Sequence, residues 1–307
     1  MRILLILALT ACTPFVASEP VPQSPPAALP GILHGHRIER VPAGYLCFGG
    51  FHRGAALDRG ARMTTLLSPG SDAWQECSPL NYPHSFFASA CIDDTAYAIG
   101  AALEKFDAAA NAWQTVIAPG QLPRSHFGAA ALGNEIFVLG GFPRVGTGFL
   151  IVNVDAATVR AAKPPPSFTH GDHLHFVCAL HDELHVWGGI DGDDSEMHTA
   201  HWVRRSGDWH ALPDCPKGMW TKFAAYAVHD GALYVFGEFG GWRYDPLGGG
   251  WQPRAKMPES VAMPAAVASN GSIWVLGGMQ SKGRGSVFFR YDIASNRWTA
   301  PKPERIP

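Results

Sequence analysis

The chain has 307 residues, of which 47% are hydrophobic and 16% are charged, and its formal net charge is −2. This balance excludes the clustered excess of Lys and Arg that a nucleic-acid-binding surface needs. Its 34 glycines and 25 prolines show no triplet period, and with 10 tryptophans and 17 phenylalanines they indicate many short strands separated by turns. The composition therefore predicts an all-β protein with a well-buried core and no nucleic-acid partner.

The N-terminal segment has the features of an export signal. A positive residue precedes an apolar run at residues 3–9, which is too short to cross a bilayer as a helix and fits a secretory signal. Residues 9–12 (LTAC) resemble the lipobox of bacterial lipoproteins. The resemblance implies that residues 1–11 are a signal peptide and that Cys12 carries the lipid. An ordinary signal cut near residue 17 is the alternative.

A proline-rich stretch follows at residues 12–31, and its composition favours an extended polyproline II tether. We expect this tether to hold a folded domain, residues 32–307, at the bacterial outer membrane or in the periplasm, with the lipid as the only membrane contact. Export implies an oxidising compartment. The remaining cysteines are odd in number, allow at most two disulfides and show no zinc-site spacing: Cys47, Cys77, Cys91, Cys178 and Cys215.

A unit with a glycine doublet recurs through the predicted domain. The doublet or its remnant occurs six times, at Gly49-Gly50, Gly100-Ala101, Gly140-Gly141, Gly188-Gly189, Gly237-Glu238 and Gly277-Gly278. A tryptophan follows in five of the six copies, at Trp74, Trp113, Trp209, Trp251 and Trp298. Six copies within residues 32–307 lie close to the ~50-residue period that is typical of kelch repeats.

On these motifs, together with the Tyr-Asp or Phe-Asp pair before the tryptophan, the segment resembles the kelch-repeat family. The resemblance implies a six-bladed β-propeller, with four antiparallel strands per blade around a central channel. Small residues such as 129–131 suit strands that crowd near the axis, and each tryptophan can pack between blades. The first copy differs, because residues 36–41 are partly charged. We expect that strand to line a polar channel; pairing elsewhere is the alternative.

The resemblance also implies that ligands meet the face built from the loops between second and third strands and between blades. Long loops at residues 51–62, 190–198 and 279–285 make this face uneven. Alignment on the doublet places five residues at one mouth of the channel: His84, Arg124, Asp172, Thr221 and Val261. This ring could bind a polar or anionic small molecule, or simply fill a hydrated channel. Candidate anchors near the face are Phe51, His52, Trp220 and Met279.

The fourth copy contains eight histidines and the acidic loop 191–196, which raises the question of a metal site. His173 and His175 alternate along a predicted strand and could share a face, with carboxylates supplied by Asp191, Asp193 and Asp194. The loop does not follow the EF-hand order of ligands. Solvated side chains are therefore the preferred interpretation, and we expect no metal or other cofactor.

Kelch enzymes provide two catalytic precedents. The copper ligand set of galactose oxidase cannot be placed here, and that enzyme has seven blades. Bacterial sialic acid mutarotases are similar in size, compartment and blade number, and their chemistry needs an acid, a base and a cation for the sugar carboxylate. The catalytic candidates would be Glu238 and Arg243. We expect a non-enzymatic, monomeric propeller that binds a cell-envelope protein or glycan, with a sugar mutarotase as the alternative.

Overall fold

The computed structural model describes a large part of the predicted domain. The described residues are 29, 33–52, 61–71, 73–168, 173–190, 198–217, 219, 224–237, 240–280 and 287–299. Cys12, the predicted signal peptide and all of the predicted tether except residue 29 lie outside them. The described residues contain no helix long and apolar enough to cross a membrane.

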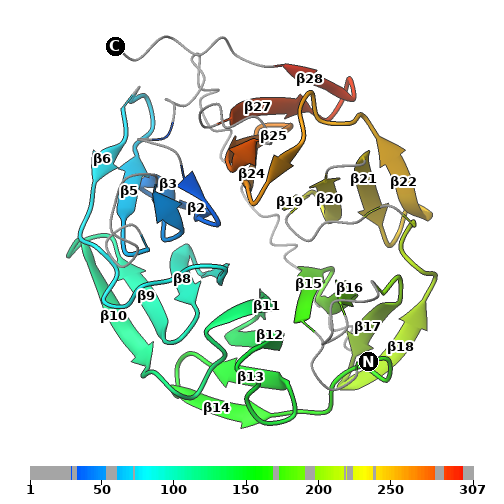
Figure 1. The fold of residues 1–307 in the computed structure, drawn as a ribbon, viewed down its shortest axis with the longest axis horizontal. Coiled ribbons are helices and arrows are strands. Elements are labelled where there is room, and N and C mark those ends of the chain that lie inside the picture. The colour runs from blue at the N-terminus through cyan, green and yellow to red at the C-terminus, as the bar shows by residue number, and fades with distance from the viewer. Residues whose placement is uncertain are drawn as a thin grey trace, which may run out of the picture.

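Six four-stranded antiparallel sheets surround a central opening (Figure 1). Blade 1 contains β2 (Arg37–Val41), β3 (Gly44–Phe48), β5 (Thr64–Leu67) and β6 (Gln75–Glu76). Blade 2 contains β7 (Ala88–Ile92), β8 (Thr95–Ile99), β9 (Leu103–Asp107) and β10 (Ala112–Ile117). Blade 3 contains β11 (Ser125–Leu132), β12 (Glu135–Phe142), β13 (Phe149–Asn153) and β14 (Thr158–Ala161).

The second half of the ring repeats this pattern. Blade 4 contains β15 (His173–Leu180), β16 (Glu183–Ile190), β17 (His201–Arg205) and β18 (Asp208–Leu212). Blade 5 contains β19 (Ala225–His229), β20 (Ala232–Gly237), β21 (Gly240–Asp245) and β22 (Gly250–Arg254). Blade 6 contains β24 (Ala265–Ser269), β25 (Ser272–Gly277), β27 (Val287–Asp292) and β28 (Arg297–Thr299). Two short pairs lie beside the blades: β1 (Leu33–His34) with β4 (Phe51–His52), and β23 (Val261–Ala262) with β26 (Met279–Gln280).

The sequence prediction of a six-bladed β-propeller with four antiparallel strands per blade is confirmed. In every blade the strands follow chain order from the channel outward, so β2, β7, β11, β15, β19 and β24 are innermost. Trp298 lies on β28, the outermost strand of blade 6. The charged first copy forms an ordinary inner strand, since β2 pairs with β3 and its Arg37 and Glu39 line the channel.

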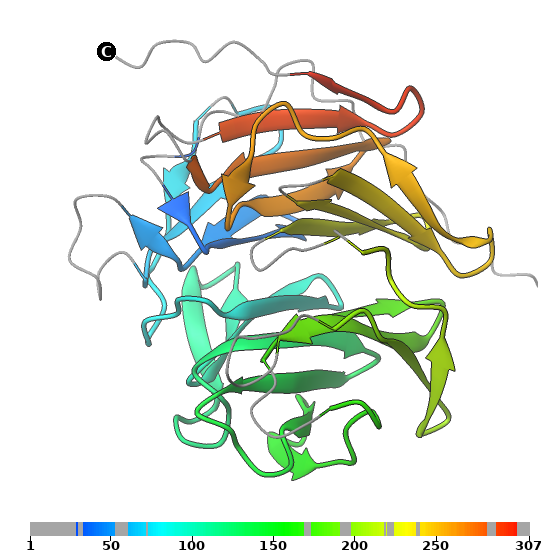
Figure 2. The same cartoon turned by 45° about the vertical axis from the view of Figure 1, so that its right-hand side comes forward.

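Apolar side chains between neighbouring blades form the core. Blades 5 and 6 stack face to face (Figure 2), and Phe236 and Tyr291 are fully buried between them. The outer tryptophans add links from one blade to the blade before it. The indole N–H of Trp113 donates to the Thr64 hydroxyl, and that of Trp298 donates to the Ala255 carbonyl, both at 2.9 Å. Their predicted position between blades is thereby confirmed.

The glycine doublets lie where the backbone passes very close to a neighbouring segment. Gly50 has a φ of +82°, and a Cβ added there would lie 2.6 Å from the backbone nitrogen of His36. A side chain at this position would therefore strain the backbone and clash. In the second copy, where Ala101 replaces the second glycine, a Cβ on Gly100 would lie 2.3 Å from Nδ1 of His84.

Candidate functional site

The inner strands enclose a cavity of about 300 Å³ in the central channel. Its polar side chains come from three blades: Arg37 and Glu39 from β2, Ser89 from β7 and Tyr226 from β19. The remaining walls are mostly small or apolar, at Ile38, Ala90, Cys91, Ala129, Ala130, Ala131, Val177, Cys178, Ala179, Ala224, Val228, Pro264, Ala265 and Ala266. The polar side chains of blades 1, 2 and 5 thus alternate around the channel with the alanine-rich strands of blades 3 and 6.

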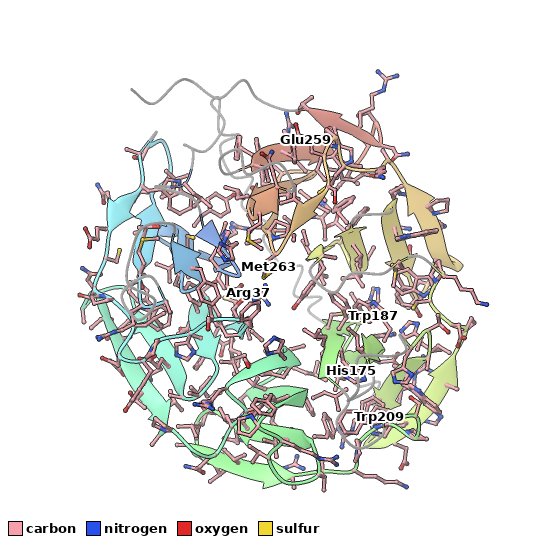
Figure 3. The ribbon with its side chains drawn as sticks, in the orientation of Figure 1. Arg37, His175, Trp187, Trp209, Glu259 and Met263 are labelled. Carbon is pink, nitrogen blue, oxygen red and sulfur yellow. The ribbon has the colours of Figure 1, made fainter. Side chains whose placement is uncertain are left out.

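A second, smaller space of about 80 Å³ lies toward the loop face. It is lined by Phe86, His126 and His175 among others, and Arg37 and Tyr226 line both spaces. These two side chains therefore stand where the channel cavity meets its mouth. Figure 3 shows Arg37 beside the central opening.

The mouth is built by a repeated left-handed backbone residue at the start of the inner strands. The positive φ angles are 64° at Gly35, 51° at Phe86, 62° at His126, 59° at Leu174 and 57° at Met263. The N–H of Gly35 donates to the Met263 carbonyl, and that of His126 donates to the Phe86 carbonyl, both at 2.9 Å. Such strained conformations persist where surrounding contacts determine them, and here those contacts join one blade to another.

In the sequence, four residues of the predicted ring precede these left-handed residues by two positions: His84, Arg124, Asp172 and Val261. His84 is buried, and its Nε2 lies 2.8 Å from Oε2 of Glu104. Arg124 is exposed to solvent, while Val261 is buried in β23. Asp172 and Thr221 lie outside the described residues. His84 and Val261 are therefore part of the protein interior, whereas the side chain of Arg124 is accessible at the surface.

The loop face displays a row of stacked rings that sequence reasoning missed in part. His34 stacks on Phe51 with ring centroids 5.0 Å apart, and Phe51 meets the edge of Phe86 at 5.3 Å. Phe86 in turn stacks on His126 at 4.8 Å. Each of these rings is half-buried, so one side of the row stays accessible. Phe86 and His126 both lie fourteen residues before the first glycine of their doublets, and this offset was the signal that could have identified them.

Two apolar side chains project from the same face. Phe142 follows the third doublet and is 66% exposed, and Met279 follows the sixth and is 41% exposed. Met279 was a predicted anchor, and Phe51 is part of the ring row. Trp220 lies outside the described residues, and so does the side chain of His52.

Burial governs the electrostatics of the channel. Burial raises the pKa of the Glu39 carboxyl. Two neighbours act in the opposite direction: the Ser89 hydroxyl, which donates to Glu39 at 2.5 Å, and the positive charge of Arg37 both lower this pKa. Burial likewise raises the pKa of the Tyr226 phenol, so this group stays a neutral hydrogen-bond donor. Arg37 is oriented by its Nε, which donates to the Phe87 carbonyl at 2.9 Å. The channel thus holds a fixed cation beside weakly acidic groups.

The metal candidates are only partly described. His175 packs against Phe168 and His198, with ring centroids 5.3 and 6.5 Å away. The side chain of His173 and the whole of Asp191, Asp193 and Asp194 lie outside the described residues. Among the residues that are described, no three or more His, Cys, Asp or Glu side chains gather as a metal site would require. The five cysteines of the domain are free thiols.

Of the two catalytic candidates the structure describes Arg243, and this residue does not line the channel cavity. Arg243 on β21 donates to the Asp245 carboxylate at 2.7 Å and to the Tyr234 hydroxyl at 3.2 Å. These contacts within blade 5 occupy its guanidinium. Glu238 lies outside the described residues.

Comparison with known proteins supports the kelch-repeat family. Residues 261–303 match the family model of the Kelch motif. The chain is 30% identical over 163 residues to Kelch-like protein 35 of Homo sapiens. This alignment covers 50% of this chain and 27% of that protein. It is 30% identical over 131 residues to the human Rab9 effector protein with kelch motifs, covering 36% of this chain and 34% of the relative.

Two further matches extend over more of the chain. Kelch-like protein terF of Aspergillus terreus is 25% identical over 217 residues, covering 61% of this chain and 46% of that protein. The solved structure of YjhT superposes with a TM-score of 0.70 over 91% of this chain and 99% of that one, at 12% identity. At that identity the likeness shows the fold alone. The chain spans less than half the length of these curated relatives.

Proposed function

We propose that this chain is a non-enzymatic binding propeller that holds a protein partner on its loop face. The observation that carries the proposal is the row of rings from His34 to His126, flanked by the exposed Phe142 and Met279. Aromatic residues and methionine are enriched in protein interfaces, where a few of them supply most of the binding energy. The name of one relative, a Rab9 effector protein, also describes a protein that acts with another protein.

The test compares proteins captured by the wild-type chain with those captured by a face variant. Phe142→Asp is expected to lose the specific partner, because it places a charge in the apolar centre of the interface. The matched control is Leu247→Asp, since Leu247 is 80% exposed in the turn between β21 and β22, at the opposite end of the blades. Quantitative mass spectrometry after crosslinking measures the amount of each partner that is captured by Phe142→Asp and by Leu247→Asp.

The proposal would be contradicted if Phe142→Asp and Met279→Asp captured the same partners in the same amounts as the control variant. A glycan array with the same variants distinguishes the other class of ligand. Glycan binding that is lost with Phe142→Asp would replace the protein partner with a sugar. The comparisons give no support to the sugar-mutarotase alternative, and its candidate cation, Arg243, is already paired with Asp245.

We further propose that this propeller acts as a monomer tethered in the bacterial cell envelope by a lipid on Cys12. The support is the lipobox-like sequence at residues 9–12 and the proline-rich stretch that follows. Cys12→Ser is expected to abolish labelling by a radioactive fatty acid and to move the chain from the membrane fraction to the soluble fraction. Labelling that persists in Cys12→Ser would refute the tether.

A further inference from the structure

The channel cavity is lined by Arg37, whose guanidinium is held by the protein through one of its three nitrogens. Arg37 donates through Nε to the Phe87 carbonyl and lies with its guanidinium carbon 5.9 Å from the Phe87 ring centroid. Among the described residues it has no other hydrogen bond and no ion pair. The two terminal nitrogens of a guanidinium form a fork that matches a planar oxyanion. Arg37 therefore presents an oriented, unused anion-binding fork to the cavity.

Tyr226 supplies a second donor from a different blade. Its ring is fixed by an edge contact with Phe176 at 5.4 Å, and it lines the same two spaces as Arg37. No hydrogen bond of its hydroxyl occurs within the described part of the chain. Two donors on separate, rigid strands thus converge on one volume, as ligand pockets require.

The rest of the cavity determines the kind of anion that fits. Ala129, Ala130 and Ala131 on β11 and Ala265 and Ala266 on β24 give the cavity apolar, alanine-rich surfaces on blades 3 and 6, next to the blades that carry the polar side chains. The volume of about 300 Å³ is at the small end of ligand pockets. A single cation compensates one negative charge, and a dianion would leave a second charge desolvated.

We propose that the central channel binds a small monocarboxylate, with the carboxylate held by Arg37 and the Tyr226 hydroxyl and the apolar body against the alanine-rich inner strands β11 and β24. This site is separate from the loop face that carries the proposed function. Glu39 is the nearby acid; burial raises the pKa of its carboxyl, while the Ser89 hydroxyl and Arg37 lower it.

The test uses ¹⁹F NMR titrations of the purified full-length chain with 4-fluorobenzoate and with the neutral isostere 4-fluorobenzamide. Saturable binding of the benzoate is expected, with the amide at least about tenfold weaker, because charge-assisted hydrogen bonds are the stronger ones. Arg37→Gln should weaken benzoate binding about tenfold or more, and Tyr226→Phe by roughly fivefold. Arg124→Gln, which removes an exposed arginine, is the matched control and should leave the affinity within about twofold.

Three results would overturn the proposal: no saturable binding of the benzoate, equal binding of the amide, or unchanged affinity in both Arg37→Gln and Tyr226→Phe. If Arg37→Gln fails to fold because the contact with Phe87 is lost, Tyr226→Phe alone decides, since it removes a single oxygen atom. Phe142→Asp should leave benzoate binding unchanged. Failure of the channel site and failure of the proposed loop-face function are therefore distinguishable.

Discussion

His84 and Glu104 meet where the chain enters blade 2, and neither side chain is exposed to solvent. The Glu104 carboxylate also accepts hydrogen bonds from the backbone N–H groups of Asn81 and Tyr82, at 2.8 and 3.2 Å. Glu104→Ala leaves these donors and the His84 imidazole buried without a partner. We expect the free energy of unfolding to fall by about 3 kcal/mol or more, measured by urea denaturation.

The matched control for this prediction is Glu135→Ala. Glu135 likewise accepts a hydrogen bond from a basic side chain, since Arg160 lies 3.0 Å away, but the side chains are 29% and 57% exposed. Exposed ion pairs contribute little, so we expect a loss below about 1 kcal/mol. Similar losses in the two variants would show that the buried contact has no special role in stability.

The doublet alignment pointed to the connections between blades, where it selected His84 and Arg124. The rings of the proposed loop face, Phe86 and His126, lie in the same connections. The difference is only two residues, and it arises because a left-handed residue turns the chain at the channel mouth. The common offset of fourteen residues before the doublet could have identified Phe86 and His126. Their contacts with Phe51 and His34 could not be predicted, because these depend on how neighbouring loops pack in the folded ring.

At the level of elements, the repeat predicted the arrangement well. Each glycine doublet, whole or partial, lies at or next to the end of a second strand. In the four complete doublets both glycines have positive φ, a conformation that residues other than glycine rarely adopt. The charged strand β2 also fits this pattern. Arg37 and Glu39 line the channel, while Ile38 packs in a core cluster and is only 5% exposed. Alternation along the strand thus reconciles a buried core with a polar cavity.

At the scale of the whole molecule, the ring closes without exchange of strands among the described residues. Blade 1 uses strands near one end of the domain, and blade 6 uses strands near the other. The seam between them is held by the buried Ile38, Cys47, Ala265 and Leu276, and by the hydrogen bond from Gly35 to Met263. The sequence could not predict this closure, because it depends on which surfaces of the first and last blades fit together.

Buried histidines make the stability of the whole ring depend on pH. Burial lowers the pKa of His36 to about 3, and it also lowers the pKa values of the adjacent His185 and His201. Below about pH 6.5 the unfolded chain takes up protons that the native state excludes, so stability is lost as the pH falls from about 6.5 toward about 3. For His36 alone, this loss amounts to about 2 kcal/mol between pH 7 and pH 5.

The contribution of His36 can be isolated by urea denaturation of His36→Leu at pH 7 and pH 5. We expect the difference in unfolding free energy between the two pH values to shrink by about 2 kcal/mol relative to the wild type, whatever the stability of the variant at pH 7. His210→Leu is the control, because His210 is exposed on β18 and its replacement should leave the difference unchanged. An unchanged difference in His36→Leu would mean that His36 takes up its proton in the native state, and the packing around β2 would then have to admit water.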